Sequence, residues 1–230
     1  MTDRYMIEAW PDAAEASRAA TEAIADWLMA GLAEDDRATF VATGGTTPGG
    51  VYDLLSTLPL PWEHVCVTLS DERWVPPEDP DSNARLLRER LLVGEAARAQ
   101  FLPLWSDVGD PEEAAEIADA ALAEILPADV VLLGMGEDGH IASLFPGSPA
   151  LEDGLDPHGG ALVIAAPKGE PAPAQARLSL TLHALRQSYL IIVLIRGAAK
   201  RAVIEEGEGL PIHALLDAAG ETPVRIIWSP

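Results

Sequence analysis

Short apolar runs alternate with helical segments along this chain, and this alternation most constrains its fold. Apolar runs at 39–42, 65–69, 129–133 and 189–195 are separated by stretches with helical periodicity, the clearest of them at 12–32. Strands without a polar face are typical of a parallel sheet covered by helices on both sides. The sequence therefore predicts an α/β fold with a mostly parallel sheet between two layers of helices.

The other expected elements extend this pattern over the 230 residues, a length that fits one domain at 1–230 better than two small ones. A Pro- and Ala-rich stretch at 167–176 is the best candidate for a mobile loop. Further strands are expected at 100–104, 162–165 and 224–228, further helices at 51–58, 83–92, 110–125, 197–206 and 212–216, and loops at 44–50, 70–82 and 134–149.

The charge balance excludes several classes of partner. The chain has 37 acidic residues against 15 Lys and Arg, a formal net charge of −22, and no basic run. Such a surface repels nucleic acid and anionic membranes. No stretch is long enough to cross a bilayer, and the start of the chain lacks a signal-peptide pattern. We expect a cytoplasmic protein, monomeric or weakly homo-oligomeric, whose one cysteine, Cys66, lies in the core.

A Gly/Thr loop follows the run at 39–42 and precedes a helix. Gly44 and Gly45 allow a ligand to approach the backbone, and the hydroxyl of Thr46 adds a donor. These features suit a phosphate, although the spacing is not that of a P-loop. A tight turn between strand and helix is the alternative interpretation.

A second glycine-rich run, at 134–139, matches the dinucleotide pattern GxGxxG. That pattern requires a helix to begin at its last glycine, and Pro146, Gly147 and Pro149 leave no room for one. We therefore expect no nucleotide, and no other cofactor, at this run.

Asp138-Gly139-His140 is the most informative part of this run. A histidine can accept a proton near neutral pH, and a nearby carboxylate can orient its ring. We predict His140 as a general base and Asp138 as its support. No metal is expected, since no HExxH pattern or paired Cys/His set accompanies them. Ser143 lacks the GxSxG context of a nucleophilic serine.

Three cations lie close to the ends of predicted strands in this acidic chain: Arg73, Arg177 and Lys200. Together they suggest a pocket for an anion. Arg73 could instead pair with the adjacent Asp71 or Glu72. Arg177 or Lys200 could simply cap or line a helix.

These segments together resemble the 6-phosphogluconolactonase family, which is related to the glucosamine-6-phosphate deaminases. The resemblance runs from about residue 40 to residue 200, and the long central segment is its most specific part. The matching residues are Gly44-Gly45-Thr46-Thr47-Pro48, Asp71-Glu72-Arg73-Trp74-Val75-Pro76, Ser82-Asn83, Gly134-Met135-Gly136-Glu137-Asp138-Gly139-His140-Ile141-Ala142-Ser143-Leu144-Phe145-Pro146-Gly147, Arg177-Leu178-Ser179-Leu180-Thr181, and Gly197 with Lys200.

This resemblance implies a Rossmann-like three-layer fold and hydrolysis of 6-phospho-D-glucono-1,5-lactone in the oxidative pentose phosphate pathway, without metal or cofactor. It implies that His140 is the base, that Asp138 supports it, and that the phosphate and sugar are bound by other matching residues. Those binding residues are Gly44, Gly45, Thr46, Arg73, Asn83, Arg177 and Lys200.

Two alternatives remain. A deaminase or isomerase of amino-sugar phosphates would resemble the chain through Asp-Gly-His, but such enzymes continue with Phe-Asn-Glu-Pro-Gly. Here Leu144 and Phe145 stand in that region without a carboxylate. A non-catalytic sugar-phosphate sensor would normally carry a DNA-binding segment, and the acidic stretch at 12–36 is a poor candidate for one.

Overall fold

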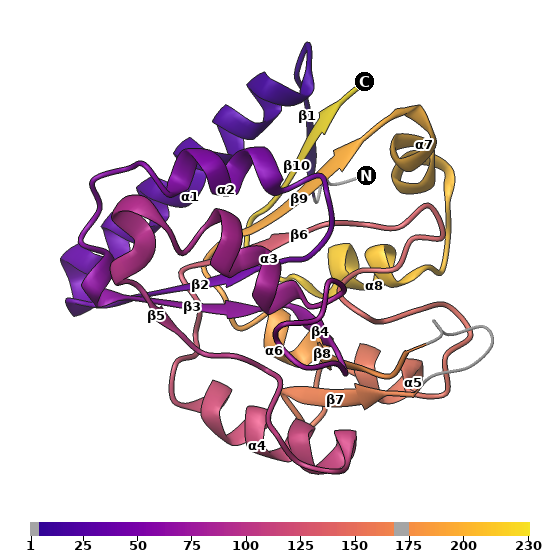
Figure 1. Cartoon of the computed structure of the whole chain (residues 1–230). Helices are drawn as coiled ribbons and strands as arrows, with labels where there is room; N and C mark the ends of the chain where they lie inside the picture. The colour runs from indigo at the N-terminus through magenta and orange to yellow at the C-terminus, as the bar shows by residue number, and fades with distance from the viewer. Residues whose placement is uncertain (1–4, 168–174) are drawn as a thin grey trace.

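A parallel sheet forms the centre of the molecule (Figure 1). The computed structural model describes residues 5–167 and 175–230, and both sheets lie within these ranges. The main sheet contains β1 (Met6–Ala9), β2 (Ala38–Ala42), β3 (Val65–Leu69), β5 (Gln100–Phe101), β6 (Val130–Leu133), β9 (Ile191–Arg196) and β10 (Val224–Ser229). Its order is β1-β10-β9-β6-β2-β3-β5, with every neighbouring pair parallel. The predicted α/β class with a mostly parallel sheet is confirmed.

Helices lie on both sides of this sheet. Figure 1 shows the first two helices above it and the sixth and eighth below it. The α-helices are α1 (Ala13–Asp35), α2 (Gly49–Leu55), α3 (Asn83–Arg90), α4 (Pro111–Ala123), α5 (Leu151–Leu155), α6 (Leu182–Leu185), α7 (Ala198–Glu206) and α8 (Pro211–Ala218), with 3₁₀ turns at Trp62–His64 and Gly94–Arg98.

The apolar runs in the sequence form the buried strands of the core. Every residue of β2 and β6 is buried, and so is β9 except for its last residue. α1 buries Ala16, Ala20, Ile24 and Leu28 against the sheet, at the spacing expected of one helix face. Full burial of an aliphatic side chain stabilises the folded state by roughly 1.5–3 kcal/mol. These strands and α1 therefore supply much of the hydrophobic driving force for folding.

A second, three-stranded antiparallel sheet was not expected. It has the order β4-β8-β7 and is built from β4 (Asp71–Arg73), β8 (Arg177–Leu180) and β7 (Val163–Ala166). The prediction of a loop throughout 70–82 is therefore wrong at its start. Three polar residues carry no strand periodicity, and β4 forms because β8, far along the chain, supplies its partner. β1 and α5 were missed as well.

Cys66 does not lie in the fully buried core, where the sequence predicted it. Cys66 is only partly buried, at the amino-terminal end of β3, and burial raises the pKa of its thiol. No helix in the described ranges is long and apolar enough to cross a membrane. Most of the proposed mobile loop at 167–176 lies outside the described residues.

Candidate active site

A pocket lies where the loops after β2 and β6 meet β4, β8 and the starts of α3 and α7. Its volume is about 270 Å³. In parallel α/β sheets this carboxyl edge of the strands is where ligands bind. The lining residues are Thr43, Gly44, Gly45, Thr46, Thr47, Pro48, Asp71, Arg73, Asn83, Gly134, Met135, Gly136, His140, Ala142, Arg177 and Lys200.

His140 and Asp138 meet within one tight turn. The Gly136 amide donates to the His140 carbonyl (2.9 Å), and Gly139 adopts a φ of +78° that suits glycine. His140 Nδ1 lies 2.6 Å from Asp138 Oδ1. With the shared proton on Nδ1, Nε2 is left as a proton acceptor. The pair therefore has the geometry expected of a general base and its supporting carboxylate.

The segment after His140 is not helical. Ile141 and Leu144 form a bridge, and α5 begins only at Leu151. A dinucleotide fingerprint would require a helix there. Instead, Phe145 packs on the His140 ring at 4.3 Å between centroids, and Ala142 adopts a left-handed φ of +47°. Backbone strain of this kind concentrates at functional sites.

The Gly/Thr loop is anchored on both sides. The buried Tyr52 hydroxyl accepts a hydrogen bond from the Thr43 amide and donates one to the Thr43 carbonyl. Asn83, the first residue of α3, packs so closely on Gly44 that a Cβ there would lie 2.1 Å from Asn83 Oδ1. Gly45 has a φ of +91°. The loop is therefore held rigidly with its backbone facing the pocket.

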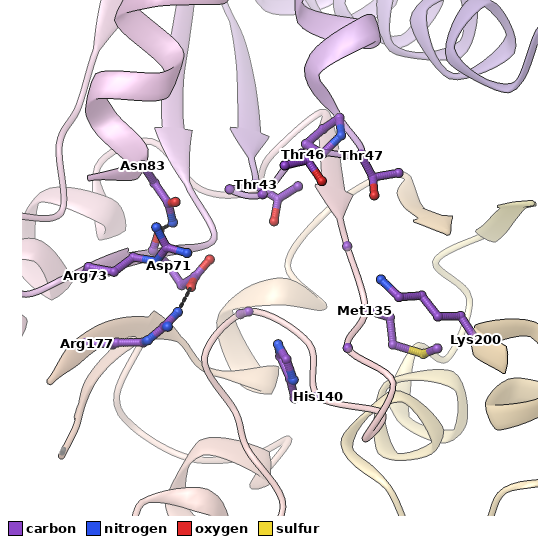
Figure 2. A pocket seen from close by; sticks show the side chains of 16 residues that line it. Thr43, Thr46, Thr47, Asp71, Arg73, Asn83, Met135, His140, Arg177 and Lys200 are labelled. Atoms are coloured by element: carbon purple, nitrogen blue, oxygen red, sulfur yellow. Dashed lines mark hydrogen bonds and ion pairs between the residues drawn. The ribbon is translucent and has the colours of Figure 1, made fainter. Parts of the chain in front are cut away.

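The cations approach the pocket from two sides. Figure 2 shows Arg73 and Arg177 on one side and Lys200 on the other, with His140 between them. Arg73 and Arg177 face each other across β4 and β8, a like-charge pairing that is unfavourable by itself. The Nε atom of each is buried without a hydrogen-bond partner among the described residues. Burial also lowers the pKa of Arg177. An anion in the pocket would offset the like-charge pairing and favour the charged form of Arg177.

The acidic neighbours of Arg73 are engaged elsewhere. Glu72 accepts hydrogen bonds from the backbone of Arg73, Asn83 and Ala84 and from the hydroxyl of Ser82, so it holds the start of α3. Asp71 lies 3.7 Å from Arg177. Among the described residues, the Arg73 side chain forms no ion pair with either carboxylate, so the alternative interpretation of Arg73 is not observed.

The structure thus brings the predicted site residues together. His140 and all seven predicted binding residues line one pocket, and Asp138 contacts His140 from outside it. Their roles remain predictions. Three residues shape the site without a predicted role. Asp71 and Glu72 have partners from other segments. The contact of Gly136 with His140 and Asp138 depends on how their turn closes. Among the described residues, no three His, Cys, Asp or Glu side chains form a cluster that could hold a metal ion.

Comparison with known proteins identifies the family. Residues 11–228 match the family described as glucosamine-6-phosphate isomerases/6-phosphogluconolactonase. The chain belongs to this family. It is 45% identical over 225 residues to a 6-phosphogluconolactonase of Caulobacter vibrioides, with 97% of each chain covered. It is 40% identical to one of Pseudomonas aeruginosa, covering 97% of this chain and 94% of the relative.

A solved structure within the family has the same fold. It is a 6-phosphogluconolactonase from Shewanella baltica, with a TM-score of 0.92, 33% identity and 98% of each chain covered. The likeness extends over the small antiparallel sheet as well as the main one, since the alignment spans nearly the whole chain. The pocket described above is therefore part of a fold that the family shares.

Proposed function

We propose that this protein hydrolyses 6-phospho-D-glucono-1,5-lactone to 6-phospho-D-gluconate, the lactonase step of the oxidative pentose phosphate pathway. The observation that carries the proposal is the position of His140, whose ring nitrogen pairs with Asp138 beside a pocket lined by three cations. The names of the related proteins support the same activity. The pocket combines a base with an anion site, which is what a phosphorylated ester requires.

The substrate phosphate would bind to the cationic lining and the Gly/Thr loop. Arg73, Arg177 and Lys200 supply charge, and the backbone at Gly44–Thr46 supplies N–H donors. Holding the phosphate fixes the position of the lactone carbonyl relative to His140. Orientation of this kind converts binding energy into rate.

The chemical step requires one activated water. His140 Nε2 takes a proton from water, and the resulting hydroxide adds to C1 of the lactone to form a tetrahedral oxyanion. Collapse of the oxyanion breaks the bond between C1 and the ring oxygen, which receives the proton from His140. Asp138 stabilises the imidazolium between these steps, and a base of this kind contributes about 10²–10⁴-fold.

A deaminase of amino-sugar phosphates is the second candidate, because Asp71 places another carboxylate in the pocket. Both Asp71 oxygens already accept hydrogen bonds from serine hydroxyls, and Leu144 is buried and apolar. These hydrogen bonds compete with a transferred proton for the Asp71 oxygens, and Leu144 cannot act as a base, so this activity is the less favoured of the two. Release of ammonia from glucosamine 6-phosphate would identify this activity.

The decisive assay uses the phosphorylated and unphosphorylated lactones side by side, with spontaneous hydrolysis subtracted. We expect strong preference for the phosphorylated lactone and loss of most activity in His140→Ala, with binding of 6-phosphogluconate largely retained. Equal rates on both lactones would contradict the anion site. Near wild-type turnover in His140→Ala would contradict the base.

The proposal also covers the setting in which the protein acts. We expect one domain over 1–230, working in the cytoplasm as a monomer or weak homo-oligomer on a small molecule. The strongly acidic composition supports the absence of nucleic-acid and membrane partners.

A further inference from the structure

A buried network of polar side chains joins the loops that form the pocket. We call it the Asp71 network; its members are Thr43, Ser70, Asp71, Ser143 and Ser179, each 5% exposed or less. Ser70 Oγ lies 3.2 Å from Thr43 Oγ1 and 3.1 Å from Asp71 Oδ1. Ser143 Oγ donates to Asp71 Oδ2 at 2.6 Å, and the Ser143 amide donates to Ser179 Oγ at 3.0 Å.

Each member of this network belongs to a segment that supplies the pocket. Thr43 precedes the Gly/Thr loop, Asp71 begins the strand that ends at Arg73, and Ser179 lies on the strand that begins at Arg177. Ser143 follows His140 by three residues in the same loop. Asp71 therefore connects the segment bearing the predicted base to the segments bearing the predicted anion-binding groups.

Ser143 is the point at which the His140 loop is attached. Only Ile141 and Ala142 separate it from His140, and Ala142 holds a left-handed conformation that an alanine does not favour. The two hydrogen bonds of Ser143 hold the loop in this conformation. An O–H···O⁻ bond of this length between buried groups belongs to the stronger class. Without this hydrogen bond, we expect Ala142 to leave its left-handed conformation and His140 to move with the turn.

We propose that Ser143 is a positioning residue for the hydrolysis, acting through Asp71 to set His140 relative to the anion-binding groups. The inference rests on the proposed function, since it concerns the same pocket. Ser143 itself does not line the pocket and is 1% exposed, so it has no direct access to substrate. Its contribution is geometric, and misplacement of a base by about 1 Å can cost about 10²-fold in rate.

The test compares Ser143→Ala with Ser188→Ala. Ser188 is a matched control, because it is also buried and its hydroxyl donates a hydrogen bond to the Leu185 carbonyl (2.8 Å), before β9 begins and away from the pocket. We expect Ser143→Ala to lower kcat by about 10- to 100-fold with KM changed by less than about threefold. Ser188→Ala should keep the wild-type kcat. Equal kcat in the two variants at similar thermal midpoints, or a loss confined to KM, would overturn the proposal.

Ser179→Ala provides a second variant should Ser143→Ala fail to fold, since it removes the other anchor of the same loop. It should also lower kcat while KM is preserved, and an unchanged kcat would count against the proposal. Where both single variants fold, the double variant should lose less than the product of their effects, because they act on one attachment. Fully multiplicative losses would contradict a shared role.

A readout without substrate separates this inference from the proposed function. The Gly136 amide donates to the His140 carbonyl, so its hydrogen exchange reports on the turn. Ser143→Ala should accelerate exchange at Gly136 by about tenfold or more relative to Ser188→Ala. If the wild-type protein lacked lactonase activity, the proposed function would fail, and unchanged exchange at Gly136 would separately refute the role of Ser143.

Discussion

A Cβ on Gly136 would lie 2.2 Å from His140 Nδ1 and 2.3 Å from Asp138 Oδ1. Gly136 therefore provides the space in which the two side chains meet. His140 and Asp138 are partly exposed, with side chains 29% and 51% accessible, so they can turn outward if this space is filled. The contact between His140 and Asp138 therefore depends on the absence of a side chain at Gly136 as well as on their hydrogen bond.

Gly136→Ala should consequently separate His140 from Asp138 while the fold persists. We expect kcat to fall by about 10²-fold or more, since the base loses its orientation, and the thermal midpoint to change little. Gly160→Ala is the control, because a Cβ there meets nothing within 4 Å. Kinetics and thermal unfolding of both variants decide the matter, and wild-type kcat in Gly136→Ala would show that the pair is dispensable.

Asp138→Asn should lower kcat by about 10- to 100-fold, less than removal of the base itself. An asparagine can donate to Nδ1 and so favour the tautomer that places the proton on Nε2. Nε2 then cannot accept a proton from water. The neighbouring Glu137 is exposed, and Glu137→Gln should leave kcat unchanged. Similar rates for the two variants would remove Asp138 from the mechanism.

Arg177→Met should weaken binding of 6-phosphogluconate by about tenfold or more, as loss of a hydrogen bond to a charged group costs roughly 1.5–3 kcal/mol. Titration calorimetry measures this loss, and the rise in thermal midpoint caused by the ligand should shrink in parallel. Arg18→Met, at an exposed site on α1, is the charge-matched control. Unaltered affinity in Arg177→Met would exclude it from the anion site.

The ion pair between Asp53 and Arg90 links α2, which follows the Gly/Thr loop, to α3, which begins at Asn83. The hydrogen bond from Arg90 lowers the pKa of Asp53 below the usual range of an aspartate. A carboxyl with a lowered folded-state pKa stabilises the protein above its unfolded-state pKa, and this contribution is lost as pH falls through the folded-state value.

Asp53→Asn should therefore be less stable than the wild type at neutral pH, by under about 1 kcal/mol because the pair is exposed. The difference should vanish at acid pH, far enough below the usual pKa of an aspartate for the wild-type carboxyl to be protonated. Urea unfolding at both pH values measures it. A difference that is independent of pH would show that the charge of Asp53 contributes nothing.

The main sheet was predictable because most of its strands can be identified from their own residues, without knowledge of their partners. β2, β6 and β9 are buried on both faces, so their composition alone marks them as strands. β4 was not predictable, because its three polar residues are a strand only in the presence of β8. β1 lies at the edge of the sheet, and its partly exposed residues lack the apolar run on which the prediction depended.

The site was predictable to the extent that its residues stand at the ends of strands. Parallel strands bring those ends to one edge, so His140 and Lys200 could be expected near the same ligand. The position of Gly136 beneath the His140 pair could not, because it depends on how one turn closes. The attachment of Ser143 to Asp71 also requires the second sheet, which the sequence did not reveal.

The predicted base and its carboxylate are two residues apart in one turn, whereas the predicted binding groups come from a loop, two strands and the first turns of two helices. The predicted proton-transfer pair is therefore local in the sequence, while the predicted binding groups are dispersed along it. Substitutions at the dispersed positions can alter which phosphorylated ligand binds while the turn that holds His140 and Asp138 stays unchanged. Proteins with this arrangement can change their ligand preference while they keep the same pair of residues for proton transfer.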